Sequence, residues 1–342
     1  MVAGLSGGGI ICSMARKIFI HDYYSIISVE NLLLAWREFV KGKKNKHDVQ
    51  EFGIKLMDNI VSLHDDLVNK KYKHAGYYAF NISDPKPRNI HKAGVRDRLL
   101  HHAIYRKLYP FFDMTFIADS YSCRIGKGTH KAIERFKIFS AQASVGYTKT
   151  CWVLKCDIRK FFASIDQEIL LFVLKKYIFD IDTAWLLERI IYSFYSTKKG
   201  KGLPLGNLTS QLLVNIYMNE FDQFVKHKLK AKYYIRYADD FVVLSENKQW
   251  LEKMLAEIND CLSRKLKLQL HPDKVYIKTL SSGVDFLGWV NFPDHKVLRT
   301  VTKRKMFRNI KLKEGKRETM QSYLGMLGHG NAYRLKQKII KI

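Results

Sequence analysis

The stretch Tyr233-Tyr-Ile-Arg-Tyr-Ala-Asp-Asp-Phe-Val-Val-Leu244 decides how the rest of the sequence is interpreted. Its two apolar runs predict a pair of strands, and Tyr237-Ala-Asp-Asp240 predicts the tight turn that joins them. Aspartate is common in such turns because its side chain hydrogen-bonds the local backbone. Two adjacent carboxylates repel each other, however, and the turn needs only one of them. A divalent cation would remove this conflict, so Asp239 and Asp240 are candidate metal ligands.

A third carboxylate comes from the segment Trp152-Val-Leu-Lys-Cys-Asp157, which predicts another strand. Side chains alternate between the two faces of a strand, so Leu154 and Cys156 share one face while Lys155 and Asp157 share the other. Asp157 therefore ends a strand with an apolar back, which suits a residue of a metal site. A solvated strand end is the ordinary alternative for Asp157 taken alone.

The chain carries an unusual excess of positive charge. Its 342 residues include 59 Lys and Arg against 32 Asp and Glu, which gives a formal net charge of +27. Such an excess repels itself unless a polyanion neutralises it. Nucleic acid is the commonest polyanionic partner, because binding to its phosphates releases counterions. The 47% of hydrophobic residues excludes disorder as the default reading.

An anionic membrane is the alternative partner, but no stretch approaches about 18 consecutive apolar residues. The five cysteines, at positions 12, 123, 151, 156 and 261, lack zinc-binding spacing and predict reduced thiols. The glycine-rich start does not read as a signal peptide, so a cytoplasmic location is expected. Met14 is an alternative to Met1 as the natural start.

Hydrophobic periodicity outlines the remaining elements. Two helices are predicted between Ser28 and Leu67, strands between 72 and 92, and then a helix capped by Asp97. A long helix, capped by Thr209 or Ser210, is predicted to run to about Lys228. Further predictions are a helix near Ala132, a helix at 249–265, hairpins at 274–298 and a basic helix from Lys303.

Taken in order, these motifs resemble the reverse transcriptases of bacterial retroelements. The resemblance rests on Asp157-Ile-x-x-Phe-Phe-x-x-Ile-Asp166, on Gly206-x-x-x-Ser210 and on Tyr237-Ala-Asp-Asp240, and it extends from about Val29 to Arg334. It implies an α+β right-hand polymerase fold with an antiparallel palm sheet. The implied parts are an N-terminal extension (1–27), fingers with first palm elements (28–150), a palm (151–290) with a helical insertion at about 167–204, and a thumb (291–342).

Leu203-Pro-Leu-Gly-Asn-Leu-Thr-Ser-Gln211 most resembles the diversity-generating retroelement subgroup. Many other reverse transcriptases carry Gln-Gly-x-x-x-Ser-Pro here, whereas this chain has Leu205 in place of the Gln and Gln211 in place of the Pro. Three further segments resemble that subgroup: Asp84-Pro-Lys-Pro-Arg88 with Asp97-Arg98, Asp119-Ser-Tyr-Ser-Cys-Arg-Ile-Gly-Lys-Gly-Thr-His130, and Ser322-Tyr-Leu-Gly325.

The resemblance also implies roles for individual residues. Asp157 and Asp239 would hold two Mg²⁺ ions, with Mn²⁺ as a possible substitute, and Asp240 would support them in two-metal phosphoryl transfer. The implied nucleotide-binding residues are Lys86, Arg88, Phe162, Leu205, Gly206 and Gln211. Phe162 matches a steric gate against the ribose 2′-hydroxyl, and Phe161 is expected in the core. A solvated basic loop is the alternative for Lys86.

Template and primer contacts are expected at Arg124, Lys127, His130, Tyr237, Gly288, Trp289, Lys303 and Arg304. Arg124, Lys127 and His130 flank a helix start, where phosphate binds readily. Phe286-Leu-Gly-Trp289 resembles a primer-grip hairpin, and a buried aromatic hairpin is the alternative for each residue taken singly. The basic residues from Lys303 to Arg317 are expected to grip the nucleic-acid backbone, with a solvated helix face as the alternative.

The function that the resemblance implies is RNA-directed DNA synthesis that makes error-prone, adenine-mutagenic cDNA for mutagenic retrohoming. Leu205 in place of an amide would remove a hydrogen-bond partner near the incoming nucleotide and lower fidelity. Implied partners are a template RNA, the primer or cDNA, deoxynucleoside triphosphates and a small basic oligomeric accessory variability protein. The alternatives are a retron, group II intron-like or phage-defence reverse transcriptase, or a catalytically inactive RNA-binding relative, against which the three intact carboxylates argue.

Overall fold

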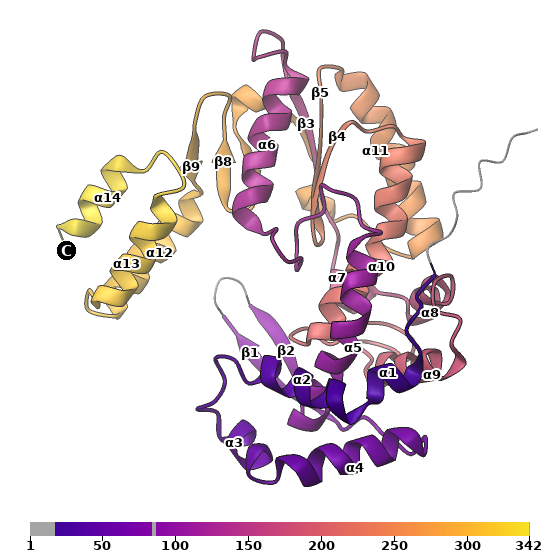
Figure 1. Cartoon of the computed structure of the whole chain (residues 1–342). Coiled ribbons are helices and arrows are strands. Elements are labelled where there is room, and N and C mark those ends of the chain that lie inside the picture. Colours follow the sequence, from indigo (N-terminus) through magenta and orange to yellow (C-terminus); the bar gives the residue numbers. More distant parts are fainter. Residues whose placement is uncertain (1–17, 84–86, 342) are drawn as a thin grey trace, which may run out of the picture.

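A computed structural model describes residues 18–83 and 87–341 of the chain (Figure 1). Within this part, helices are interspersed with three sheets, and every strand pair in these sheets is antiparallel. This mixture agrees with the α+β class that the sequence predicts.

The N-terminal helices build one side of the largest core. They are α1 (Tyr23–Ile27), α2 (Val29–Phe39), α3 (His47–Ile54), α4 (Leu56–Val68) and α5 (Val95–Asp113). Tyr23, Ile26 and Ile27 of α1 are buried in this core, so the described end of the predicted N-terminal extension is packed into the fold. The second helix predicted in this region is broken at Lys55, whose ψ of 42° is not helical, which separates α3 from α4.

The prediction that Asp97 caps the following helix is wrong. Helix α5 begins at Val95, and Gly94 occupies the N-cap position. The Asp97 carboxylate is buried and accepts hydrogen bonds from the Tyr72 hydroxyl (2.7 Å) and the Ala75 N–H (3.1 Å). Asp97 therefore ties the segment before the first strand to the helix.

A four-stranded antiparallel sheet occupies the middle of the molecule, in the order β4-β5-β3-β6. Its strands are β3 (Trp152–Asp157), β4 (Tyr233–Tyr237), β5 (Asp240–Ser245) and β6 (Tyr276–Thr279). Leu154 and Cys156 pack into the large core with α11 (Lys248–Leu266), whereas Val153 faces a second core with α6 (Thr129–Ala143). Figure 1 shows these two helices on opposite sides of the sheet. The predicted hairpin Tyr233–Leu244 and the predicted alternation in β3 are confirmed.

Helix α10 (Leu208–Gln223) runs through the large core and continues into a π-helical turn, Phe224–Lys228. Its side chains are buried on nearly all sides, as expected for a central helix with little amphipathic character. It contacts α5, α8 (Gln167–Lys175) and α11. The short helix α7 (Phe161–Ser164) precedes α8, and α9 (Ile181–Ile191) follows it.

Two smaller sheets complete the structure. One is the hairpin of β1 (Tyr77–Ile82) and β2 (Arg88–Ala93), and the other contains β7 (Val284–Phe286), β8 (Trp289–Asn291) and β9 (Lys296–Leu298). Short 3-10 turns lie at Pro272–Lys274 and Leu280–Ser282. The hairpins predicted at 274–298 are correct only from β7 onward, because β6 pairs with β3.

The C-terminal helices α12 (Thr300–Leu312), α13 (Arg317–Leu327) and α14 (Tyr333–Ile340) form a separate small core with Trp289. Ile133 of α6 also joins this core and so connects the C-terminal unit to the central sheet. Figure 1 shows the three helices projecting from the rest of the molecule. No helix among residues 18–83 and 87–341 is both long enough and apolar enough to span a membrane.

A partly buried histidine, His102, predicts how stability changes with pH. Burial, together with the positive charges of Lys43 and Arg98, lowers the pKa of His102 to about 4. The unfolded chain takes up this proton near pH 6.5, whereas the folded chain does so only near pH 4, so stability is lost as the pH falls through this window. We expect His102→Gln to lessen the acid-induced loss of unfolding free energy by roughly 1 to 2 kcal/mol, after allowance for partial exposure.

Denaturant unfolding of both proteins at pH 7.5 and pH 4.5 measures this difference. His47→Gln, at an exposed histidine that begins α3, is the matched control and should retain the full pH dependence of the original protein. An equal loss of stability in the His102→Gln variant and the original protein would contradict the expectation.

Candidate functional site

The three predicted aspartates lie on neighbouring strands at one end of the central sheet. Asp240 is paired with Tyr237 across the hairpin and with Asp157 of β3 on its other side. The Ile158 N–H donates to the Asp239 carbonyl oxygen over 3.1 Å, which fastens the turn to the end of β3. Antiparallel pairing thus brings Asp157 beside an acidic pair that is distant in the sequence.

The hairpin turn has an unusual backbone. Ala238 and Asp239 form a two-residue connection, and Ala238 has a φ of 56°. Two-residue hairpin turns need a positive φ, which glycine adopts without cost, whereas a side chain there costs on the order of 1 kcal/mol or more. The contacts around the turn must therefore stabilise this conformation.

Two lysines neutralise part of the carboxylate charge. Lys155 Nζ lies 2.8 Å from Asp240 Oδ1, and Lys274 Nζ lies 3.1 Å from Asp157 Oδ1. Burial nevertheless raises the pKa of Asp240 to about 6, and the charges of Asp157 and Asp239 contribute to this rise while Lys155 opposes it. Burial and the charge of Asp157 likewise raise the pKa of Asp239. The site therefore holds more negative charge than its lysines balance.

This donor set fits a divalent metal ion in its chemistry. Carboxylate oxygens are the ligands that Mg²⁺ and Mn²⁺ prefer, and a cation would offset the burial and the mutual repulsion that raise the two pKa values. Among the residues that the structure describes, however, no group of three or more His, Cys, Asp or Glu side chains is arranged as a metal site. One oxygen each of Asp157 and Asp240 contacts a lysine instead. Each carboxylate has a second oxygen that can serve as a metal ligand.

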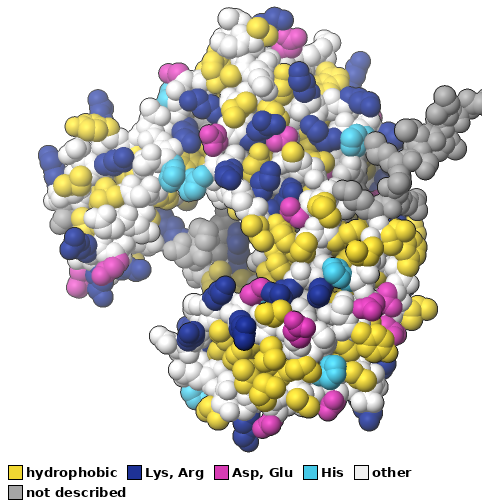
Figure 2. Space-filling model, in the orientation of Figure 1, with side chains coloured by type: hydrophobic (Ala, Val, Ile, Leu, Met, Phe, Trp, Pro, Cys, Tyr) yellow, Lys and Arg dark blue, Asp and Glu magenta, His cyan; other side chains and the backbone are white. Residues whose placement is uncertain are grey.

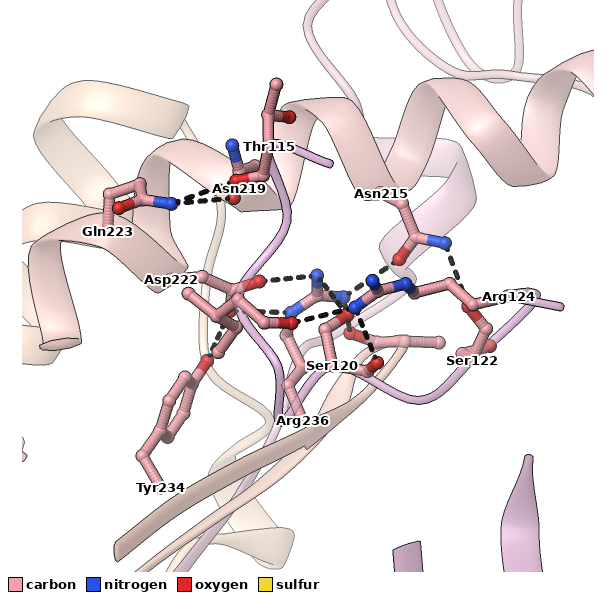
Figure 3. A network of polar contacts seen from close by, with 12 residues as sticks. Thr115, Ser120, Ser122, Arg124, Asn215, Asn219, Asp222, Gln223, Tyr234 and Arg236 are labelled. Atoms are coloured by element: carbon pink, nitrogen blue, oxygen red, sulfur yellow. Dashed lines mark hydrogen bonds and ion pairs between the residues drawn. The ribbon is translucent and has the colours of Figure 1, made fainter. Parts of the chain in front are cut away.

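Arg236, two residues before Ala238 of the turn, is completely buried (Figure 3). Its guanidinium forms a two-pronged ion pair with Asp222 of α10, with both N···O distances at 2.7 Å. It also donates to the Ala238 carbonyl oxygen over 3.1 Å. The same side chain therefore contacts both the central helix and the turn that carries the acidic pair.

The loop before α10 is fastened to strand β2. The His91 N–H donates to the Leu205 carbonyl oxygen over 3.0 Å, and the Asn207 amide donates to the His91 carbonyl oxygen over 2.7 Å. Gly206 has a φ of 109°, and a Cβ at this position would lie 2.7 Å from Ile90 Cγ2. This close approach explains why a glycine stands there.

The predicted cap of α10 is wrong. Asn207 occupies the N-cap position but makes no side-chain cap hydrogen bond, because its amide donates to His91 and accepts from Ala93 of strand β2. Thr209 and Ser210 are buried inside the first turn. Gln211 is partly buried in the same turn.

The structure describes two of the three other predicted nucleotide contacts, Phe162 and Arg88. Phe162 is partly buried, and its carbonyl oxygen accepts from the Leu203 N–H over 2.9 Å. Phe161 is buried, as predicted. Arg88 is exposed at the start of β2, and its charge partly opposes the rise in the pKa of Asp239. Lys86 lies outside the described residues.

The predicted template contacts near α6 separate into two kinds. Arg124 is buried and donates through all three guanidinium nitrogens to Asp113 and to backbone carbonyls, so it holds its own loop together. Lys127 donates to the Ala118 carbonyl oxygen over 2.8 Å. His130 is exposed and stacks on His329, with ring centroids 3.7 Å apart. Of the three residues, only His130 is exposed.

The predicted primer-grip residues differ in exposure. Trp289 is only 3% exposed and belongs to the C-terminal core, where it packs against Gly330. This position corresponds to the buried-hairpin alternative. Gly288 has a positive φ of 88° in the turn before β8. Tyr237 is partly buried, and its hydroxyl accepts from the Thr129 hydroxyl over 3.2 Å.

Lys303 and Arg304 lie in the first turns of α12, with Arg304 exposed and Lys303 partly buried. Figure 2 shows a hollow between the C-terminal helices and the body of the molecule, with Lys and Arg side chains on both sides of it. The hollow is the feature of this face that best suits a bound polyanion.

Sequence reasoning did not assign roles to Lys155, Lys274, Arg236 and Asp222. The alternation in β3 places Lys155 on the same face as Asp157, so the sequence alone could have predicted that this lysine lies near the site. Lys274 and Asp222 come from distant segments, and only the folded chain brings them to the site.

Comparison with known proteins matches residues 81–290 to the family described as reverse transcriptase (RNA-dependent DNA polymerase). The chain is 26% identical over 284 residues to protein YkfC of Escherichia coli (strain K12), across 72% of each chain. It is 24% identical over 263 residues to the group II intron-encoded protein LtrA of Lactococcus lactis subsp. cremoris, covering 56% of this chain and 42% of LtrA. It is 30% identical over 145 residues to the retron Ec73 reverse transcriptase of Escherichia coli, covering 38% and 43%.

Proposed function

Because the chain belongs to the reverse transcriptase family, whose members are RNA-dependent DNA polymerases, we propose that it copies the template RNA of a diversity-generating retroelement into error-prone cDNA. Template RNA and deoxynucleoside triphosphates are the substrates of this family. The observation that carries the retroelement assignment is Leu205 in the loop before α10. Its side chain offers no hydrogen bond where many reverse transcriptases have a glutamine.

The proposed chemistry is attack of the primer 3′-hydroxyl on the α-phosphate of a nucleotide, with loss of pyrophosphate. Asp157 and Asp239 would hold two Mg²⁺ ions, for which Mn²⁺ could substitute, and Asp240 would support them. When bound, such ions activate the hydroxyl and neutralise phosphate charge. The chain itself contributes the alignment of three carboxylates by strand pairing and the positive charge of Arg88 near them. Lys86 would add to this charge.

The remaining assignments follow the proposed polymerase architecture. The central sheet would be the palm (151–290), residues 28–150 the fingers, and 291–342 the thumb. Lys127, His130, Tyr237, Gly288, Lys303 and Arg304 would contact template or primer. For Arg124 and Trp289 we propose a supporting role, because their side chains are buried against other parts of the protein.

A second candidate is a retron-type or group II intron-type reverse transcriptase. The similarity to LtrA and to the retron Ec73 enzyme supports this candidate as much as it supports the first. The two candidates differ in the errors that they predict, because only the diversity-generating role calls for excess substitution at template adenines. A small basic accessory protein belongs to the first candidate alone.

Leu205→Gln tests the fidelity proposal. The variant should make fewer errors at template adenines, because the added amide can hydrogen-bond near the nascent base pair. One such hydrogen bond, of about 1 kcal/mol, corresponds to a roughly fivefold lower error rate. Deep sequencing of cDNA made on one defined RNA by the original protein and the variant measures the change.

Leu205→Met is the matched control, because it keeps an apolar side chain at this position and should leave the error spectrum unchanged. An identical spectrum for the original protein and Leu205→Gln would overturn the role of Leu205. An original protein without excess errors at adenines would favour the second candidate.

Phe162→Ala tests the proposed steric gate. Removal of the ring should let ribonucleotides enter, because the clash with the 2′-hydroxyl is lost. We expect discrimination against ribonucleotides to fall roughly 10- to 100-fold, which corresponds to a clash of about 1 to 3 kcal/mol. Single-nucleotide incorporation with matched dNTP and rNTP measures the ratio. The control is Phe161→Ala at the buried neighbour, which should lower stability while the discrimination stays unchanged. Equal discrimination in the original protein and Phe162→Ala would exclude the gate.

A further inference from the structure

The ion pair of Arg236 and Asp222 lies in a buried network of hydrogen bonds next to the site. Both side chains have 0% exposure. The guanidinium has five N–H donors, and five contacts are present: two to Asp222 and one each to Asn215, Ser120 and the Ala238 carbonyl oxygen. Figure 3 shows the guanidinium between Asp222, Asn215 and Ser120. Each donor of Arg236 therefore has an acceptor.

This network joins three segments that are far apart in the sequence. Asp222 and Asn215 come from α10, and the Asn215 amide donates to the Ser122 carbonyl oxygen over 2.9 Å. The Arg236 backbone pairs with the strand-like segment around Ser120, through Arg236 N–H to Asp119 and Tyr121 N–H to Arg236. Arg236 thereby connects the hairpin turn to α10. The first turn of α10 follows the Leu205–Gly206 loop.

A buried ion pair is a poor way to gain stability, since well-packed apolar side chains of similar volume often stabilise a fold equally well. Its value here is geometric. The Arg236 donor to the Ala238 carbonyl oxygen, at 3.1 Å, supports a residue whose φ of 56° is unfavourable for alanine. Asp239 is the next residue along the chain, so the same contact holds the peptide from which the Asp239 side chain extends.

We propose that Arg236 is a positioning residue, which holds the Ala238–Asp239 turn in the conformation that binds the divalent ion. Asp222 in turn fixes the guanidinium through its two-pronged contact. This inference rests on the proposed function, because it assumes that Asp157, Asp239 and Asp240 are metal ligands. It predicts that a variant without the guanidinium stays folded but binds the metal ion with lower affinity.

The test uses the double variant Arg236→Met with Asp222→Asn in the full chain. Removing Arg236 alone would leave Asp222 as an unpaired buried charge and could unfold the protein, whereas the double variant removes both charges. The amide introduced at position 222 still offers an oxygen to the Tyr234 hydroxyl, which in the original protein donates to Asp222 over 2.7 Å. Mn²⁺ affinity of the protein without nucleic acid, measured by electron paramagnetic resonance of free Mn²⁺, provides a readout independent of catalysis.

We expect the folded double variant to bind Mn²⁺ at least fivefold more weakly and to need at least fivefold more Mg²⁺ for half-maximal primer extension, with little change in the KM for dNTP. Tyr234→Phe is the matched control, because it removes one hydrogen bond of the same network but leaves the contact to Ala238. It should lower the melting temperature without changing either metal response.

A folded double variant with the original Mn²⁺ affinity and Mg²⁺ dependence would overturn the positioning role and leave Arg236 as a structural residue. Absence of extension by the original protein would instead count against the proposed function, while its Mn²⁺ affinity would still test the positioning role. The two failures are therefore distinguishable.

Discussion

Replacing Asp239 by asparagine should abolish nucleotide incorporation while leaving the fold intact. The amide keeps the size of the side chain but removes the negative charge that would bind the metal ion. Loss of a transition-state contribution of about 4 kcal/mol corresponds to a roughly 10³-fold slower reaction. Single-turnover incorporation of one nucleotide on an RNA template measures the rate directly.

The same substitution should not lower stability in the absence of divalent ions. Burial and the charge of Asp157 raise the pKa of Asp239, so at neutral pH the ionised carboxylate destabilises the folded chain. The neutral amide removes this effect, and its advantage should shrink as the pH is lowered and the original carboxyl takes up its proton. Melting curves at pH 7.5 and pH 5 measure this difference.

Asp260→Asn is the matched control for Asp239→Asn. Asp260 lies on α11, where it pairs with Arg264, and both side chains are largely exposed. This variant should incorporate nucleotides at the original rate. An Asp239→Asn variant with more than a tenth of the original rate would contradict the assignment of Asp239, and a strong loss of its melting temperature would assign the residue a structural role instead.

The second large effect is expected for Gly206→Ala. A Cβ would lie 2.7 Å from Ile90 Cγ2, and the φ of 109° is unfavourable for any side chain. Overpacking of this kind costs about 1 to 3 kcal/mol, and the loop would move away from β2 to relieve it. Because this loop is proposed to contact the nascent base pair, we expect at least a roughly 10-fold loss of kcat/KM for dNTP.

Two further variants separate the clash from the backbone strain. Gly206→Ala with Ile90→Ala removes the clashing methyl group and should recover part of the lost activity. Gly42→Ala has a comparable positive φ of 70° but nothing within 4 Å of the added Cβ, and its turn lies outside the proposed site. It should lose some stability and keep full activity. Normal kinetics for Gly206→Ala would exclude the proposed place of this loop beside the nucleotide.

The sequence predicted the parts of the site that depend on local pattern. The hairpin Tyr233–Leu244 follows from two apolar runs, and the position of Asp157 at the end of β3 follows from alternation. Register was not visible in the sequence, because the pairing of Asp157 with Asp240 depends on the whole sheet. The structure supplies that pairing and so supports treating the three aspartates as one group.

Side chains with two plausible roles were harder to predict. Arg124 and Trp289 belong to motifs typical of nucleic-acid contact, yet both are buried against protein, and tertiary packing decides such cases. The expected caps at Asp97 and Thr209 failed for a related reason. Asp97 accepts hydrogen bonds from Tyr72 and Ala75, and the Asn207 amide donates to strand β2. These long-range hydrogen bonds replace the local capping pattern.

The most direct test of the account is extension of a DNA primer on an RNA template by the purified full chain and by Asp157→Asn. We expect the original protein to extend the primer with dNTPs only when Mg²⁺ or Mn²⁺ is added, and the variant to show no extension above background under either ion. Extension that persists in the Asp157→Asn variant, or an original protein that fails to extend the primer with either ion, would contradict the assignment of Asp157, Asp239 and Asp240 as the polymerase centre.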